Sequence, residues 1–128
     1  MTAGDTTARA VLLVEDSMII ALDTEECLLG LGAERVVVQG TVAGALSALA
    51  AEDFDLAFLD FNLGGESSEA VAEELKQRRI PFWLATGYGE MADKLKELGA
   101  RGLLIKPYGK EELAQIMREF ASGEPPQD

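Results

Sequence analysis

The chain has 128 residues, of which 48% are hydrophobic and 27% are charged, and this is the size and composition of one globular domain rather than of a disordered chain. Its formal net charge is −12 and it has no run rich in lysine or arginine, so we expect no binding to nucleic acid or to anionic membranes. It has one cysteine, no basic-then-apolar leader and no apolar run near the roughly 18 residues that span a bilayer, which predicts a cytoplasmic protein without an internal disulfide.

The first third of the chain predicts two strands, each followed by a helix. The short apolar run AVLLV at 10–14 is typical of a strand buried on both faces of a sheet. Ser17 can cap a helix that continues to about residue 31, where two glycines favour its end. The β-branched run RVVVQ at 35–39 predicts the second strand, and the alanine-rich stretch 41–52 predicts the second helix.

The middle of the chain predicts a third strand and a third helix with a turn between them. The run LAFLD at 56–60 predicts the strand, and NLGGES after it has the composition of a turn. Ser67 or Ser68 can cap the helix, which we expect to end near Arg79.

The remainder of the chain predicts two more strands and two more helices. The fourth strand is expected at 82–85 and the fifth at 102–105, because both runs are short and apolar. Between them a helix is expected at 90–98, with Gly99 as its stop signal. The last helix is expected at 110–121.

Apolar strands that alternate with helices at this spacing predict an α/β fold. Five parallel strands would form one doubly wound sheet, a (βα)5 arrangement with helices on both faces. The connections should be right-handed crossovers. We expect a single domain over 9–121, a frayed N-terminus over 1–8 and a flexible tail over 122–128.

Polar residues gather where these strands end. In open parallel sheets ligands bind outside the carboxyl ends of the strands, so the residues at those points are candidates for a site. If the first strand is central, the convergent residues are Glu15, Asp16, Asp60, Thr86, Lys106 and Pro107.

The predicted site would hold three carboxylates, one hydroxyl and one ammonium. Crowded carboxylates repel one another, and oxygen ligands without histidine or cysteine suit a hard cation, Mg²⁺ or Mn²⁺. Lys106 could pair with a carboxylate or a phosphoryl group, and Thr86 could donate a hydrogen bond. Together these groups indicate phosphoryl transfer to a carboxylate, with Asp60 as the best nucleophile. Taken singly, Glu15 and Asp16 could simply complement a helix dipole and Asp60 could be a turn residue.

At these positions the sequence resembles the receiver (response regulator) domain of two-component signalling and is similar to the single-domain, CheY-like chemotaxis regulator. The resemblance covers residues 9–120 and rests on four short motifs: VEDS after the first strand, LAFLDFNL around Asp60, ATG after the fourth strand and IKP after the fifth. It implies a flavodoxin-like strand order, 2-1-3-4-5.

The resemblance also implies residue roles. Asp60 would accept a phosphoryl group from a histidine kinase or a histidine phosphotransfer protein, since this chain has no histidine of its own. Lys106 would pair with the phosphoryl oxygens, Thr86 would move to hydrogen-bond them, and the Lys106–Pro107 bond would be cis. The implied ligands of Mg²⁺ are Glu15, Asp16, Asp60 and the backbone carbonyl of Asn62.

One position departs from the usual receiver pattern. Leu104 stands two residues before the lysine, where most receivers have a tyrosine or phenylalanine that relays phosphorylation to the output face. The stretch PFWLATGYG looks like the motif of the FATGUY receivers, although Leu84 replaces its phenylalanine. Tyr88 and Tyr108 are therefore the candidate signalling aromatics, and Tyr88 is expected to shield the acyl phosphate from water.

The resulting hypothesis is a stand-alone receiver that signals by protein contact or by shuttling phosphate. It would catalyse only its own phosphotransfer and autodephosphorylation, and would not bind DNA. A downstream target would dock on the fourth helix, fifth strand and fifth helix, through Tyr88, Tyr108, Lys94 and Lys110. The alternatives are a degenerate receiver that only binds partners, a haloacid dehalogenase-like phosphatase, and a flavin- or nucleotide-binding protein. The phosphatase lacks support because no Asp-x-Asp follows the first strand, and the nucleotide site lacks a glycine-rich loop.

Overall fold

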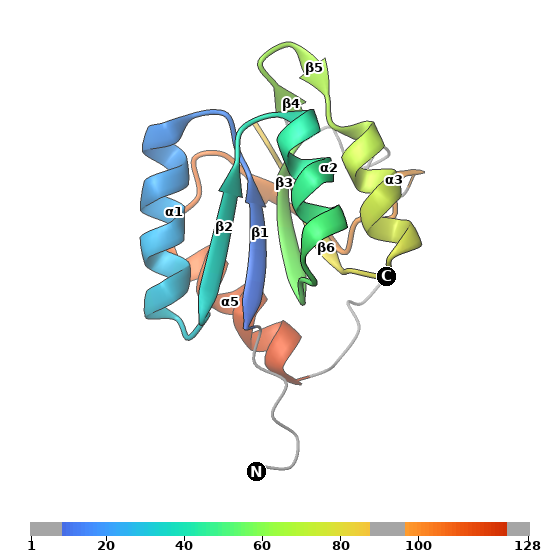
Figure 1. The fold of residues 1–128 in the computed structure, drawn as a ribbon. Helices are drawn as coiled ribbons and strands as arrows, with labels where there is room; N and C mark the ends of the chain where they lie inside the picture. The colour runs from blue at the N-terminus through green and yellow to red at the C-terminus, as the bar shows by residue number, and fades with distance from the viewer. Residues whose placement is uncertain (1–8, 88–96, 123–128) are drawn as a thin grey trace.

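Five parallel strands form the central sheet of the computed structural model, which describes residues 9–87 and 97–122. The strands lie in the order β2-β1-β3-β6-β7 (Figure 1). Counted along the chain, this is the predicted order 2-1-3-4-5. The strand bounds are β1 (Ala10–Val14), β2 (Arg35–Gln39), β3 (Leu56–Asp60), β6 (Phe82–Thr86) and β7 (Gly102–Ile105).

Helices cover both faces of the sheet, as the doubly wound fold requires (Figure 1). Helices α1 and α5 pack on one face, and α2 and α3 pack on the other. Their bounds are α1 (Met18–Gly30), α2 (Val42–Ala51), α3 (Glu69–Gln77) and α5 (Lys110–Ser122). Residues 97–98 are helical, and the rest of the helix predicted at 90–98 lies outside the described residues.

The core has two halves because successive side chains of a strand point to opposite faces. In β1, Val11 and Leu13 pack with α1 and α5, whereas Leu12 and Val14 pack with α2 and α3. All four are at most 1% exposed. Burying each such side chain stabilises the fold by about 1.5–3 kcal/mol, which explains why the central strands consist of apolar residues on both faces.

The predicted cap at Ser17 is present, and Thr41 caps the second helix in the same way. Ser17 Oγ accepts a hydrogen bond from the backbone N–H of Ile20 at 3.4 Å, and Thr41 Oγ1 accepts one from Gly44 at 2.9 Å. These hydroxyls satisfy backbone donors that the first helical turn leaves without partners.

Both of the serines predicted as possible caps take part at the start of α3. Ser68 holds the N-cap position but is fully buried, and its hydroxyl donates to the Phe61 carbonyl at 3.0 Å. Ser67 Oγ instead accepts from the backbone N–H of Glu69 at 3.2 Å. The two serines therefore divide the tasks of anchoring the loop and capping the helix.

The segment predicted as the turn NLGGES is a small antiparallel hairpin. It consists of β4 (Asn62–Leu63) and β5 (Glu66–Ser67), and it projects beyond the carboxyl ends of the sheet strands (Figure 1). The two residues between the strands, Gly64 and Gly65, have φ angles of 60° and 93°. Positive φ at both loop positions is what a tight hairpin turn requires, and glycine adopts it without steric cost.

The C-terminus of α3 is closed by a left-handed residue that is not glycine. Arg79 has φ 60°, its N–H donates to the Lys76 carbonyl at 3.1 Å, and the N–H of Ile80 donates to the Leu75 carbonyl at 2.9 Å. This pair of bonds is the Schellman pattern, in which glycine usually occupies the left-handed position. The helix thus ends two residues before the predicted Arg79.

Candidate functional site

The residues predicted at the strand ends do meet at one edge of the sheet. Glu15 and Asp16 directly follow β1, Asp60 ends β3, Thr86 ends β6 and Lys106 directly follows β7. The strand register brings these ends level, because Val14 pairs with Leu59, Asp60 with Ala85 and Thr86 with Ile105. The parallel fold therefore brings together side chains that lie up to 91 positions apart in the chain (15 to 106).

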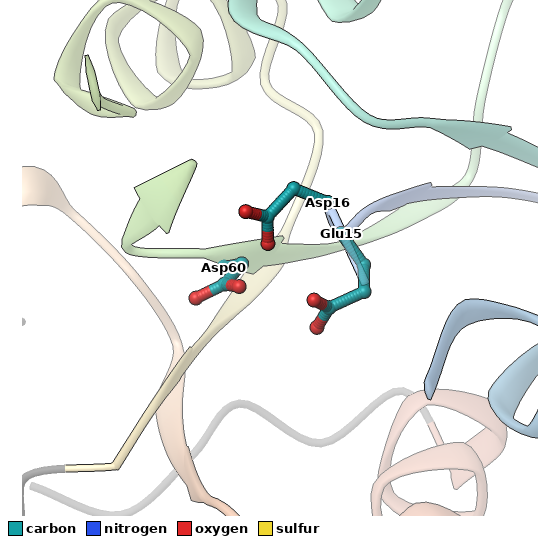
Figure 2. A group of neighbouring side chains, drawn as sticks. All are labelled: Glu15, Asp16 and Asp60. Carbon is teal, nitrogen blue, oxygen red and sulfur yellow. The ribbon is translucent and has the colours of Figure 1, made fainter. Parts of the chain in front are cut away.

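Three carboxylates form the centre of the site. Figure 2 shows the carboxyl groups of Glu15, Asp16 and Asp60 gathered where β1 and β3 end. One oxygen from each lies within 4.8 Å of the others. Glu15 and Asp60 are buried, at 1% and 5% exposed, whereas Asp16 is exposed. This all-oxygen set with one open side fits Mg²⁺ or Mn²⁺, which bind few carboxylates and keep several waters.

Lys106 is the cation of the site. Its Nζ lies 2.8 Å from Asp60 Oδ2 and 3.0 Å from Glu15 Oε1, so it bridges the two buried carboxylates. Burial opposes the ammonium charge, but the hydrogen bonds to Asp60 and Glu15 outweigh it and raise the pKa of Lys106. One ammonium against three carboxylates leaves two negative charges in excess, which a divalent cation would neutralise.

Glu15 is fixed at both carboxylate oxygens. Oε1 meets Lys106, and Oε2 accepts a hydrogen bond from the backbone N–H of Ser17 at 2.9 Å. Burial raises the pKa of Glu15 although both of these partners act in the opposite direction. Its backbone N–H donates to the Gln39 carbonyl at 2.9 Å, which fixes the residue to β2 as well.

Asp60 is held between the lysine and the β4–β5 hairpin. Its Oδ1 accepts a hydrogen bond from the backbone N–H of Asn62 at 3.4 Å, while Oδ2 faces Lys106. The Asn62 side chain in turn accepts from the N–H of Gly65 at 3.0 Å, which closes the hairpin. Gly64 lies near the site as well, since a Cβ there would be 3.6 Å from Asp16 Oδ2. The predicted role of the Asn62 carbonyl as a metal ligand stays a prediction.

Thr86 is 4% exposed and lies at the end of β6 as predicted. Its backbone carbonyl accepts a hydrogen bond from the Lys106 N–H at 2.8 Å, so the two residues are joined through the main chain. Movement of Thr86 on phosphorylation stays a prediction. Tyr88 and Lys94, which the sequence also marked, lie outside the described residues.

The segment after β7 contains Pro107 and Tyr108, which were also predicted site residues. The Lys106–Pro107 peptide bond is cis, as the resemblance implied. Tyr108 is half-buried and turned toward α1, where its hydroxyl lies 3.0 Å from Thr24 Oγ1. Leu104 is 3% exposed and packs on the α1–α5 face.

Thr24 is a residue that the sequence reasoning missed. It is 3% exposed in the middle of α1 and 84 positions from its partner Tyr108. A threonine inside a helix that is otherwise rich in apolar and acidic residues is only a weak sign of a buried hydrogen bond. Its partner can be found only once the fold is known.

A hollow of about 820 Å³ adjoins the site between α1 and the segment after β7. Its lining includes Ile19, Leu22, Glu26, Lys106, Pro107 and Tyr108. Four apolar side chains of α1 are well exposed: Met18 at 53%, Ile19 at 83%, Leu22 at 62% and Leu29 at 44%. Lys106 thus faces the carboxylates and also borders an apolar surface.

The sequence profile of the response regulator receiver domain matches residues 11–118, which is most of the chain. The chain belongs to this family. Receivers are signalling domains of two-component systems rather than enzymes acting on separate substrates, and they bind Mg²⁺ in their acidic site.

Relatives of this receiver support the assignment. The sensory transduction protein LytT of Bacillus subtilis is 28% identical over 113 residues, which are 86% of this chain and 47% of LytT. This receiver spans less than half of the length of the curated relatives that it matches.

Solved receiver structures share the fold. The CheY-like receiver from Methanospirillum hungatei has a TM-score of 0.81 at 24% identity, over 90% of this chain and 94% of that one. The receiver domain of sensor histidine kinase PA1611 from Pseudomonas aeruginosa, solved with a magnesium ion in its active-site cleft, has a TM-score of 0.79 at 24% identity over 91% and 98% of the two chains. Among the helices that the structure of this receiver describes, none has the length and apolar character needed to cross a bilayer.

Proposed function

We propose that this receiver accepts a phosphoryl group on Asp60 from the phosphohistidine of a histidine kinase or a histidine phosphotransfer protein. The observation that carries the proposal is the contact of Asp60 with Lys106 beside two further carboxylates. An aspartate needs such a cation to bring a second negatively charged group close to it. Glu15 and Asp16, with Asp60 and the Asn62 carbonyl, would hold Mg²⁺ (or Mn²⁺), which neutralises carboxylate and phosphoryl oxygens when bound.

The proposed reaction is one in-line displacement. A carboxylate oxygen of Asp60 attacks phosphorus, and the phosphorus–nitrogen bond of the donor breaks with its electron pair left on the imidazole, which takes a proton from solvent. Lys106 keeps its ammonium beside the oxygen that Asp60 turns toward it and pairs with the phosphoryl oxygens as they arrive. Thr86, at the end of the neighbouring strand, would donate its hydroxyl to the same oxygens. The Lys106 N–H that donates to the Thr86 carbonyl keeps these two phosphate-binding residues in register.

The proposal is tested with phosphoramidate, a small donor that contains the same phosphorus–nitrogen bond. We expect the purified chain to gain one phosphoryl group in the presence of Mg²⁺, detected by intact mass, and Asp60→Asn to gain none. Asp53→Asn removes the same charge at an exposed position before β3 and should react like the wild type. Incorporation that persists in Asp60→Asn would refute Asp60 as the acceptor, and no incorporation in the wild type would favour the binding-module alternative.

We also propose that the protein donor docks on the apolar side of α1. The exposed Ile19 and Leu22 border the same hollow as Lys106, so a donor seated there would bring its histidine near Asp60. Asp23 and Glu26 line the hollow too and favour a donor helix with basic residues beside its apolar ones. This assigns the donor to α1, whereas the predicted surface on the fourth helix, β7 and α5 is proposed for a downstream target.

The docking proposal predicts a difference between two donors. Leu22→Gln should slow phosphotransfer from a phosphorylated kinase at least several-fold and leave the reaction with phosphoramidate unchanged, because the small donor needs no docking surface. Leu29→Gln makes the same change near the far end of α1 and is the matched control. Equal slowing with both donors would refute docking at Leu22.

Three features of the chain favour one subgroup of receivers. We propose that residues 9–121 act as a stand-alone FATGUY-type receiver in the cytoplasm, with no nucleic-acid-binding output. The motif PFWLATGYG, the buried Leu104 in place of the usual aromatic and the net charge of −12 support this. We expect the phosphorylated chain to leave the electrophoretic mobility of labelled duplex DNA unchanged. A mobility shift at physiological salt would contradict the absence of a nucleic-acid-binding output.

A further inference from the structure

The side chains of Thr24 and Tyr108 join α1 to the segment that carries Lys106. Their oxygens lie 3.0 Å apart, although the residues are 84 positions apart in the chain. Thr24 is 3% exposed, and burial raises the pKa of the Tyr108 hydroxyl, so the bond lies largely away from solvent. Breaking this hydrogen bond is costly mainly at Thr24, because that buried hydroxyl would be left without its partner.

On the α1 side the Tyr108 ring packs against the α1–α5 half of the core, but two hollows flank it there. The hollow of about 820 Å³ lies against Tyr108, and a second hollow of about 350 Å³, lined by Tyr108, Gly109 and Lys110, also meets α1 at Thr24. The Tyr108 side chain thus borders two spaces while it crosses to the helix. Interdigitated side chains cannot hold the backbone where such spaces exist. The hydroxyl contact therefore contributes more to the position of this segment than it would in a filled core.

Tyr108 is also close along the chain to the functional ammonium. One residue, Pro107, separates it from Lys106, whose Nζ contacts Glu15 and Asp60 at 3.0 and 2.8 Å. At its other end the segment is held by Gly109, whose N–H donates to Glu112 Oε1 at 2.9 Å. A displacement of Tyr108 would therefore move the backbone of Lys106 relative to the carboxylates.

We propose that Thr24 and Tyr108 are a positioning pair, whose hydroxyl–hydroxyl bond to α1 holds Lys106 at the distance from Asp60 that phosphoryl transfer needs. The phosphotransfer part of this inference rests on the proposed function, and the positional part does not. The pair also joins Lys106 to the helix proposed as the donor's docking site, so that movement of α1 is transmitted to the ammonium through one side-chain contact. Leu104 cannot provide such a link, since it has no polar group and is buried against the α1–α5 face.

The positional part is tested without metal or phosphate by amide hydrogen exchange. Thr24→Val and Tyr108→Phe each remove one hydroxyl and keep the side-chain shape. We expect the Lys106 N–H, which donates to the Thr86 carbonyl, to exchange roughly three- to tenfold faster in both variants, as loss of one net hydrogen bond implies. Amides of β1 should keep their wild-type rates. Thr24→Ser keeps the hydroxyl, so in this variant the Lys106 amide should exchange as slowly as in the wild type. Wild-type exchange at Lys106 in both variants, or equal acceleration in β1, would overturn the inference.

The phosphotransfer part is tested by the initial rate with saturating phosphoramidate and Mg²⁺. Thr24→Val and Tyr108→Phe should each lower this rate roughly three- to tenfold, and the double variant should be no slower than either single one. In a Lys106→Met background neither change should have a further effect, because the ammonium that the pair positions is gone. The same fold-change in both backgrounds would show a general structural role and refute positioning of Lys106. If the wild type takes up no phosphoryl group, the proposed function fails, and the exchange experiment still decides whether the pair holds the segment.

Discussion

Asp16→Asn should have opposite effects on stability with and without Mg²⁺. Asp16 is the exposed member of the carboxylate cluster, and oxygens of Glu15 and Asp60 lie within 4.8 Å of its own. Without metal the three charges repel, and the asparagine relieves the part of the repulsion that involves Asp16. With metal the same substitution removes a proposed ligand, so the wild type gains stability and the variant gains much less.

The magnitude follows from the distance and the exposure. Two unit charges 4.8 Å apart repel by about 0.9 kcal/mol in water, and the dielectric constant of water is appropriate because Asp16 is exposed. Asp16 repels two carboxylates, and Lys106 offsets part of this, so the variant should be about 1 kcal/mol more stable in EDTA, or about 4 °C higher in Tm for a domain of this size. Mg²⁺ at 100 times its Kd should stabilise the wild type by about 2.7 kcal/mol, which reverses the order.

Thermal unfolding followed by circular dichroism, in EDTA and in a series of Mg²⁺ concentrations, measures both effects. Asp53→Asn carries the same charge change at an exposed position outside the site, and it should follow the wild type in every condition. The reasoning is refuted if Asp16→Asn unfolds below the wild type in EDTA, or if Mg²⁺ raises the Tm of both by the same amount. High salt should shrink the difference in EDTA, because exposed charges are screened.

Three further predictions concern stability, each measured by urea unfolding. Arg79→Gly should stabilise the chain by about 1 kcal/mol because the left-handed φ of 60° is costly for a residue with a Cβ, and a loss would contradict this. Gly102→Ala should destabilise it by roughly 1–3 kcal/mol, since the new Cβ would lie 2.7 Å from Trp83 Nε1; an unchanged midpoint would show that the indole moves freely. Burial raises the folded-state pKa of Glu15 above its ordinary value of 4.5. In EDTA the stabilising contribution of Glu15 to the free energy of unfolding should therefore be fully present below that pH and be lost as pH rises through the folded-state pKa. Glu15→Gln should flatten this fall, and a parallel pH profile of variant and wild type would refute it.

The sheet could be predicted from sequence because its three central strands, β1, β3 and β6, are buried on both faces. Runs such as AVLLV and LAFLD admit no polar residue until the strand ends, so the first polar residue also marks the carboxyl edge of the sheet. Asp60 and Lys106, 46 positions apart, were placed together by this reasoning alone, and their atoms are 2.8 Å apart. The residue types at the strand ends then indicated the chemistry of the site.

Contacts between distant side chains could not be predicted in the same way. The sequence marked Tyr108 as a surface contact, but only the packing of α1 against the segment after β7 shows that its hydroxyl meets Thr24. The β4–β5 hairpin was predicted only as a turn for a local reason: its strands are too short for an alternating pattern, and the pair Gly64–Gly65 was the one available signal. The helix predicted at 90–98 stays a prediction except at residues 97–98.

Trp83 gives this protein a built-in optical probe. It is the single tryptophan of the chain, 5% exposed, with its ring 6.4 Å from that of Phe58 and its indole nitrogen against Gly102. It lies three residues before Thr86 on β6, and beside a hollow of about 440 Å³ between β7 and α5. Trp83 lies on a strand that ends at the site, and its ring borders β7 and α5. Because the chain has no other tryptophan, its emission reports from this one position. Recording that emission during a titration with Mg²⁺ or phosphoramidate would show, without any label, whether binding or phosphorylation at the carboxylates changes the surroundings of Trp83.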